Sequence, residues 1–161
     1  MKRFCCASFS VLGVMTLSAI LLWGTSPSSV RAHCQVPCGI YDDAARIARL
    51  HEDATTIAKA MAEMAKLAGG HNAQALNQGA RWVTTKEAHA SHVIQVVSEY
   101  FLTQKVKPVA AGADGYDAYL SKLADHHAVM VAAMKAKQNA AASYAEKLHT
   151  AIEAMAKHYG K

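Results

Sequence analysis

Apolar residues recur at alternating steps of three and four between positions 47 and 68 of the chain. They are Ile47, Leu50, Ala54, Ile57, Met61, Met64 and Ala68. This heptad spacing places them along one face of an α-helix and is typical of helices that pack nearly parallel to one another. Asp42 or Asp43 can cap the start of the helix, and Gly69-Gly70 ends it. A chain with such a face must bury it against other helices.

Three further helices are predicted, at about 73–104, from near Tyr116, and at about 140–158. The expected inner faces carry, in order, Leu76, Val83, Val93, Val97 and Tyr100, then Leu120, Leu123, His127, Met130 and Met134, then Ala145, Leu148, Ile152, Met155 and Tyr159. On this pattern His127 is expected to be a core histidine. No segment alternates like a strand, so the sequence predicts an all-α, up-down-up-down four-helix bundle over residues 42–161.

The first 32 residues have the features of a cleavable signal peptide. Lys2 and Arg3 precede a mostly apolar run from about Phe9 to Trp23, and Val30 and Ala32 suit a signal peptidase. The expected cut is Ala32/His33. The signal peptide would direct export, so the mature protein is expected in the periplasm or outside the cell. The apolar run is shorter than the roughly 20 residues of a spanning helix, so we expect no stable membrane anchor after cleavage. A retained anchor is the alternative.

The positive charge of the chain belongs largely to this leader. Removing residues 1–32 removes three basic residues and no acidic one, which lowers the formal charge from +5 to +2. No basic run with interleaved aromatic residues is present, so we expect no nucleic-acid binding. The remaining 129 of the 161 residues are enough for one domain with its own core.

Cys34 and Cys38 are the two cysteines outside the leader. A disulfide is the default for an exported protein, but this one would close a very small loop and stabilise little. Cleavage before His33 opens a second possibility, because it frees an α-amine. That amine, the Cys34 amide nitrogen and the Cys34 thiolate form consecutive five-membered chelate rings, and Cys38 can supply a fourth ligand.

Two nitrogen and two thiolate donors in a plane suit Ni(II) or Cu(II), whereas a zinc site would favour a tetrahedral set. The His33 imidazole could add an axial nitrogen. Thiolate and anionic amide donors should lower the potential of a Ni(III)/Ni(II) couple into a range useful for one-electron chemistry. The residues alone therefore leave a redox centre, a metal carrier and a disulfide open.

The segment His33-Cys-Gln-Val-Pro-Cys-Gly-Ile-Tyr41 resembles the nickel hook of the nickel superoxide dismutase family, H-C-x-x-P-C-G-x-Y, at all six fixed positions. The resemblance implies one nickel ion per subunit, bound by His33, Cys34 and Cys38. It implies that Tyr41 stands beside the open face of the metal and orders water or substrate. It further implies disproportionation of superoxide to O2 and H2O2 through a Ni(III)/Ni(II) cycle, in a homohexamer of four-helix bundles. The chain would then divide into a signal peptide (1–32), a nickel hook (33–41) and a bundle (42–161).

The sequence departs from some relatives around the expected site. In some relatives an acidic residue on the first helix orients the axial imidazole. The matching position in this chain falls near Ala48, which has no acidic group, and Glu52, one turn further along the helix, is the suggested substitute. In the same relatives an arginine on the second helix supports this network. The matching position here falls near Thr85, and Arg81, one turn before it, is the suggested substitute. Tyr100 matches a family segment and either approaches the site or is a core aromatic.

Two other functions compete with the dismutase hypothesis. One is an exported nickel- or copper-binding protein without turnover, which histidine-rich helices such as that with His89 and His92 would suit. The other is a structural bundle with a small disulfide. A di-metal site in the bundle core needs two E-x-x-H motifs, and only Glu146–His149 is present.

Overall fold

The computed structural model describes residues 42–160, all of which lie in one compact unit. The elements are α2 (Asp43–Leu67), α3 (Ala73–Gln95), the π-helix η1 (Val96–Lys105), α4 (Tyr116–Gln138) and α5 (Ser143–Ala156). No strand occurs among the described residues, which confirms the all-α prediction. No helix within 42–160 combines the length and the apolar character needed to cross a membrane. The predicted signal peptide and hook lie outside the described residues.

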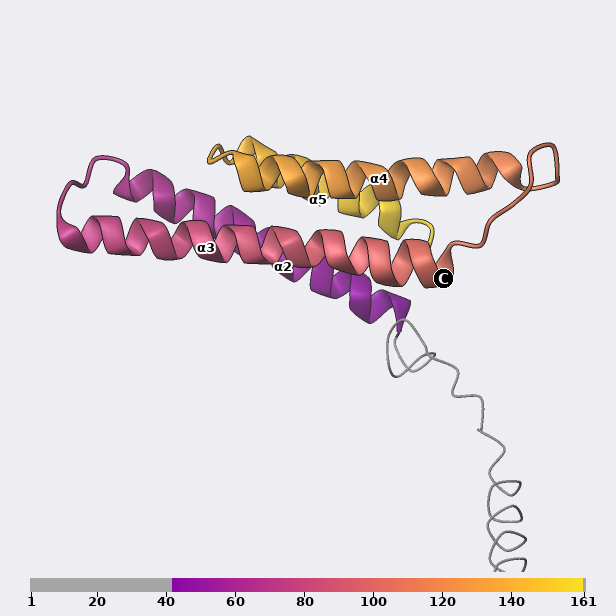
Figure 1. Ribbon diagram of the computed structural model, residues 1–161, viewed down its shortest axis with the longest axis horizontal. Helices are drawn as coiled ribbons and strands as arrows, with labels where there is room; N and C mark the ends of the chain where they lie inside the picture. Colours follow the sequence, from indigo (N-terminus) through magenta and orange to yellow (C-terminus); the bar gives the residue numbers. More distant parts are fainter. Residues whose placement is uncertain (1–41, 161) are drawn as a thin grey trace, which may run out of the picture. The chain divides into compact units, whose positions relative to one another are not determined.

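The helices follow one another around the bundle in chain order. Helix α2 packs against α3 and α5, and α4 packs against the same two neighbours. Figure 1 shows the chain reversing direction at each connection, so that consecutive helices run antiparallel. This is the up-down-up-down arrangement expected from four amphipathic helices joined by short connections.

Local sequence explains where the helices begin. The Asp42 side chain accepts a hydrogen bond of 2.8 Å from the Ala44 amide, and Asn72 accepts one of 2.8 Å from the Ala75 amide. Each side chain thereby satisfies an amide that the first helical turn leaves without a partner. Gly115 precedes α4 with a φ of 85°, a left-handed conformation that glycine adopts without steric cost.

The core lies between the four helices and consists of aliphatic residues with a few aromatic ones. In α2 the predicted face is confirmed at its centre, because Leu50, Ala54, Ile57 and Met61 are all buried. Four of the five residues predicted for the last helix, Ala145, Leu148, Ile152 and Met155, are buried in α5, and Tyr159 is half-buried beyond its end. Both helices therefore present the face that their heptad spacing indicates.

The predicted inner face of α4 was wrong at three of its five positions, whereas Leu123 and Met130 are half-buried and Met130 packs against the core. Leu120 and Met134 are 43% and 41% exposed, and His127 is on the surface. The residues that face the core are His126, Val129, Ala133 and Ala136. Small alanines let the neighbouring helices approach closely. The helix therefore turns its alanine face inward and leaves the larger side chain of Met134 partly in solvent.

The second predicted helix differs from expectation at both ends. Near its start Leu76 and Val83 are exposed, whereas Val93, Val97 and Tyr100 are buried as predicted. Its last ten residues form the π-helix η1. The Val106 amide donates a hydrogen bond of 2.9 Å to the Phe101 carbonyl, five residues earlier, which is the spacing of a π-helix. The side chains of Phe101 and Val106 are both buried. Such segments often mark functional regions of a helix.

One buried charge ties α3 to the end of α4. Lys86 is 3% exposed, and its Nζ donates to the carbonyls of Ala136 at 2.8 Å, Asn139 at 3.2 Å and Lys137. A cation is favourable there because the last carbonyls of a helix lack amide partners and carry partial negative charge. Burial lowers the pKa of this ammonium group.

Candidate metal centre

The predicted metal ligands His33, Cys34 and Cys38, and the predicted catalytic Tyr41, lie outside the described residues. Tyr41 is joined directly to Asp42, so the described residues at the start of α2 form the end of the bundle that the hook adjoins in the chain. Figure 1 shows that this end also holds the end of η1 and the end of α5. These three elements form the end of the bundle at which the described residues begin.

Asp43, the first residue of α2, joins that helix to η1. Its Oδ1 accepts a hydrogen bond of 2.7 Å from the Tyr100 hydroxyl and lies 3.0 Å from the Lys105 ammonium group. The sequence suggested Asp43 only as a helix cap and gave no signal for its contact with Tyr100 or Lys105. The carboxylate instead holds two η1 side chains at the point where the chain enters the bundle.

Tyr100, which sequence placed either in the core or near the site, is buried and polar at once. It is 4% exposed, its ring meets Phe101 edge-on at 5.0 Å, and the Arg46 guanidinium lies 4.9 Å from its centroid. Burial, followed by the hydrogen bond to Asp43, raises the pKa of its phenol to about 12. At physiological pH Tyr100 is therefore a neutral hydrogen-bond donor held in one orientation.

A second tyrosine lies next to this group. The Nδ1 of His126 donates to the Lys122 carbonyl at 2.6 Å, so its Nε2 accepts from the Tyr159 hydroxyl, also at 2.6 Å. Burial lowers the pKa of His126, while burial and then the charge of Asp43 raise the pKa of Tyr159. His126, rather than the predicted His127, is thus the core histidine, and it is satisfied on both nitrogens.

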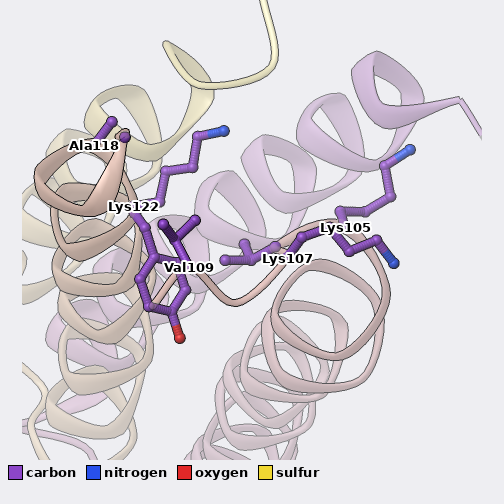
Figure 2. A pocket seen from close by; sticks show the side chains of 8 residues that line it. Lys105, Lys107, Val109, Ala118 and Lys122 are labelled. Carbon is purple, nitrogen blue, oxygen red and sulfur yellow. The ribbon is translucent and has the colours of Figure 1, made fainter. Parts of the chain in front are cut away.

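A basic pocket opens beside Lys105. It has a volume of about 260 Å³ and is lined by Lys105, Val106, Lys107, Val109, Gly115, Ala118, Tyr119 and Lys122. Figure 2 shows the three lysines around it, from the end of η1, the following loop and α4. Because Lys105 also contacts Asp43, the pocket lies next to the entry of the chain into α2. Its charge favours small anions.

Of the two residues suggested as substitutes around the axial imidazole, Glu52 has another partner and Arg81 is exposed. The Glu52 carboxylate pairs with Arg49 at 2.8 Å and is 66% exposed, while Ala48 is exposed and Thr85 is half-buried. Asp53, one residue further along α2, is buried and accepts hydrogen bonds from His89 and His92. Sequence spacing paired the two histidines but gave no indication of the aspartate between them.

Within residues 42–160 no group of three histidine, cysteine or acidic side chains is arranged to hold a metal ion. The predicted ligands His33, Cys34 and Cys38 carry an imidazole and two thiols, which are side chains of the kind that nickel takes. These residues therefore fit the ion, and they precede the bundle in the chain.

Comparison with known proteins agrees with this chemistry. The family model for nickel-containing superoxide dismutase matches residues 28–161. Neither the curated proteins nor the solved structures contain a significant match to the chain. The family match covers the cysteine-containing segment together with the whole bundle, so the enzyme class is an oxidoreductase and the cofactor is nickel. The chain belongs to the nickel-containing superoxide dismutase family.

Proposed function

We propose that the chain disproportionates superoxide at a processed N-terminus that begins with His33. The ligands would be the amine and imidazole of His33, the amide and thiolate of Cys34, and the thiolate of Cys38. The observation that carries this proposal is the family match over residues 28–161, a range that includes all six fixed hook positions. Nickel bound there would supply a Ni(III)/Ni(II) couple that oxidises one superoxide to O2 and reduces another to H2O2.

The reduction of superoxide to H2O2 consumes two protons, so the surroundings must hold donors in fixed positions. Tyr41 is proposed to order water or substrate beside the metal. The hydrogen bond of 2.7 Å from the Tyr100 hydroxyl to Asp43 uses the proton of the phenol itself, so Tyr100 supports this function by holding η1 against the start of α2. Its raised pKa keeps it protonated across the physiological range. Asp43 acts through Tyr100 and is a positioning residue.

The basic pocket supports the same function through charge. Superoxide is a small anion, and the positive potential of Lys105, Lys107 and Lys122 raises its local concentration near the entry of the chain into α2. The net charge of the mature chain would be only +2, so the placement of these lysines matters more than the total. Lys105 is partly neutralised by Asp43 at 3.0 Å, which leaves Lys107 and Lys122 as the main contributors.

The N-terminal segment defines how the site would arise. We propose that residues 1–32 are removed during export, which creates the His33 amine and leaves no membrane anchor. The enzyme would then work in the periplasm or outside the cell. By resemblance to the family, it would assemble as a homohexamer with one nickel ion per subunit.

The decisive experiment follows superoxide decay by pulse radiolysis with nickel-loaded protein that starts at His33. The matched control has one additional alanine ahead of His33, which converts the amine into a peptide nitrogen and changes nothing else. We expect fast decay only with the free amine. Equally slow decay in both proteins would refute the proposed site and would instead support a metal-binding protein without turnover.

A further inference from the structure

A cluster of two histidines and one aspartate lies between α2 and α3, within the described residues. His89 and His92 are three residues apart on α3, a spacing that places both imidazoles on the same side of the helix. Asp53 of α2 lies between them and is 1% exposed. One of its oxygens is 2.7 Å from the Nδ1 of His89, and the other is 2.6 Å from the Nδ1 of His92.

This arrangement fixes the tautomer of both histidines. A carboxylate offers only acceptors, so each Nδ1 must carry the hydrogen that Asp53 accepts. In the neutral imidazole the other nitrogen, Nε2, then carries the lone pair. Both rings are therefore held in the form that binds a metal through Nε2. Metal-binding histidines usually donate their second ring nitrogen to a carboxylate or carbonyl in this way.

The two rings are also accessible. The side chains of His89 and His92 are 29% and 39% exposed, whereas Asp53 is buried beneath them. Together with Arg49 and Ala88 they line a pocket of about 210 Å³. No other carboxylate lines it, and the small side chain of Ala88 leaves room for solvent. An ion bound there would take two nitrogen ligands from the protein and complete its coordination with water.

A purely structural role explains less of this geometry. Burying a carboxylate is costly, and Arg49 gives only a distant charge contact of 4.0 Å, so the two Nδ1–H groups are the main partners of Asp53. One histidine would be enough to tie α2 to α3. Two histidines, both oriented by one buried acid and both partly open to solvent, line the same pocket with imidazoles that are suited to binding a metal ion.

We propose that His89 and His92, oriented by Asp53, bind a divalent transition-metal ion of the class that prefers imidazole, such as Zn(II), at the surface between α2 and α3. Its residues are not those of the proposed hook, and the proposal does not depend on the proposed function. Because it has two protein ligands and open positions, it would exchange its ion readily, whereas the hook would hold nickel for turnover.

The test is a Zn(II) titration of the nickel-loaded protein, followed by imidazole ¹H–¹⁵N correlation spectra. Before zinc is added, His89 and His92 should both show the Nδ1–H tautomer. Added Zn(II) should shift the Nε2 resonances of these two residues. The same shifts should occur with Cys34→Ser/Cys38→Ser protein, in which the hook cannot bind metal, so the outcome is independent of the dismutase proposal.

Substitutions separate metal binding from a structural tie. His89→Ala and His92→Ala should each abolish the saturable shift of the remaining ring, while His127→Ala, at an exposed position on α4, should leave zinc binding unchanged. Asp53→Asn keeps the size of the side chain but accepts from only one Nδ1–H, so one histidine should change tautomer and zinc affinity should fall about 10- to 100-fold. If Asp53→Asn does not fold, the histidine variants still decide the matter. Zinc affinity that is equal in wild type and in both histidine variants would overturn the proposal.

Discussion

Asp43 and Tyr100 stand 57 residues apart in the sequence, yet a hydrogen bond of 2.7 Å joins the carboxylate of one to the hydroxyl of the other. Asp43 opens α2 directly after the residues of the hook motif, and Tyr100 belongs to η1. The bond therefore fixes the start of the bundle against the π-helix. It also buries a phenol whose protonation can be followed directly.

The first prediction concerns this phenol at alkaline pH. The raised pKa of Tyr100, about 12, means that the folded state holds this proton after an unfolded chain, with a tyrosine pKa near 10, has lost it. The stabilising contribution is fully present below about pH 10 and is lost as pH rises through 12. We expect the free energy of unfolding, measured in urea, to fall between pH 10 and 12.

Two variants identify Tyr100 as the source. Tyr100→Phe should reduce the alkaline slope, of which Tyr159, whose pKa is also raised by burial, supplies the remaining part. Asp43→Asn should lower the pKa of Tyr100 because it removes the nearby negative charge. Absorbance near 295 nm reports tyrosine ionisation and should lose a late-titrating component in Tyr100→Phe. An unchanged late component in that variant would assign the raised pKa to another residue.

The second prediction concerns the lysines of the basic pocket. Lys107→Glu/Lys122→Glu should lower kcat/KM for superoxide by about tenfold at low ionic strength, since charge in a concave site governs the encounter with a small anion. The deficit should shrink as salt rises, because salt screens these charges. Lys59→Glu is the matched control, on the surface of α2 and about 24 Å along the helix from Asp43. A deficit that does not vary with salt would indicate a structural effect.

The third prediction tests the register of α4 with two identical substitutions. Leu148 of α5 is fully buried and Leu120 of α4 is 43% exposed, although sequence spacing placed both on inner faces. Leu148→Ala should lower the free energy of unfolding by about 2–5 kcal/mol, because it leaves a cavity in the core. Leu120→Ala should change it by no more than about 0.5 kcal/mol. Urea denaturation of the two variants measures both changes. Equal losses of unfolding free energy would show that Leu120 faces the core, as the sequence spacing predicted.

This difference shows where sequence patterns specify burial and where they do not. In α2 the apolar residues form one continuous face, whose centre is Leu50, Ile57 and Met61. The inward orientation of that face could therefore be predicted from the spacing. In α4 apolar residues occupy more than one face, and the choice between Met134 and Ala133 depends on how closely the neighbouring helices approach. That distance is a property of the packed bundle.

The same distinction applies to the site. The predicted metal ligands lie in one contiguous segment, so the sequence alone could suggest nickel as the cofactor, and the family match supports that cofactor. The contacts of Asp43 with Tyr100, and of Asp53 with His89 and His92, join residues from different helices. No spacing within one segment indicates such pairs, because they depend on the register of one helix against another.

The fourth prediction separates the metal from the stability of the bundle. The described residues have a continuous core of their own and no group of three side chains that could hold an ion, whereas the proposed nickel ligands all precede Asp42. Removing nickel with a chelator should therefore abolish superoxide dismutation. The helical circular dichroism signal should be retained, and the free energy of unfolding should change by no more than about 0.5 kcal/mol. Small proteins whose core depends on a metal unfold when it is removed, and that behaviour would serve as the contrast. A large loss of helicity or of unfolding free energy on chelation would show that the hook and the bundle fold as one cooperative unit.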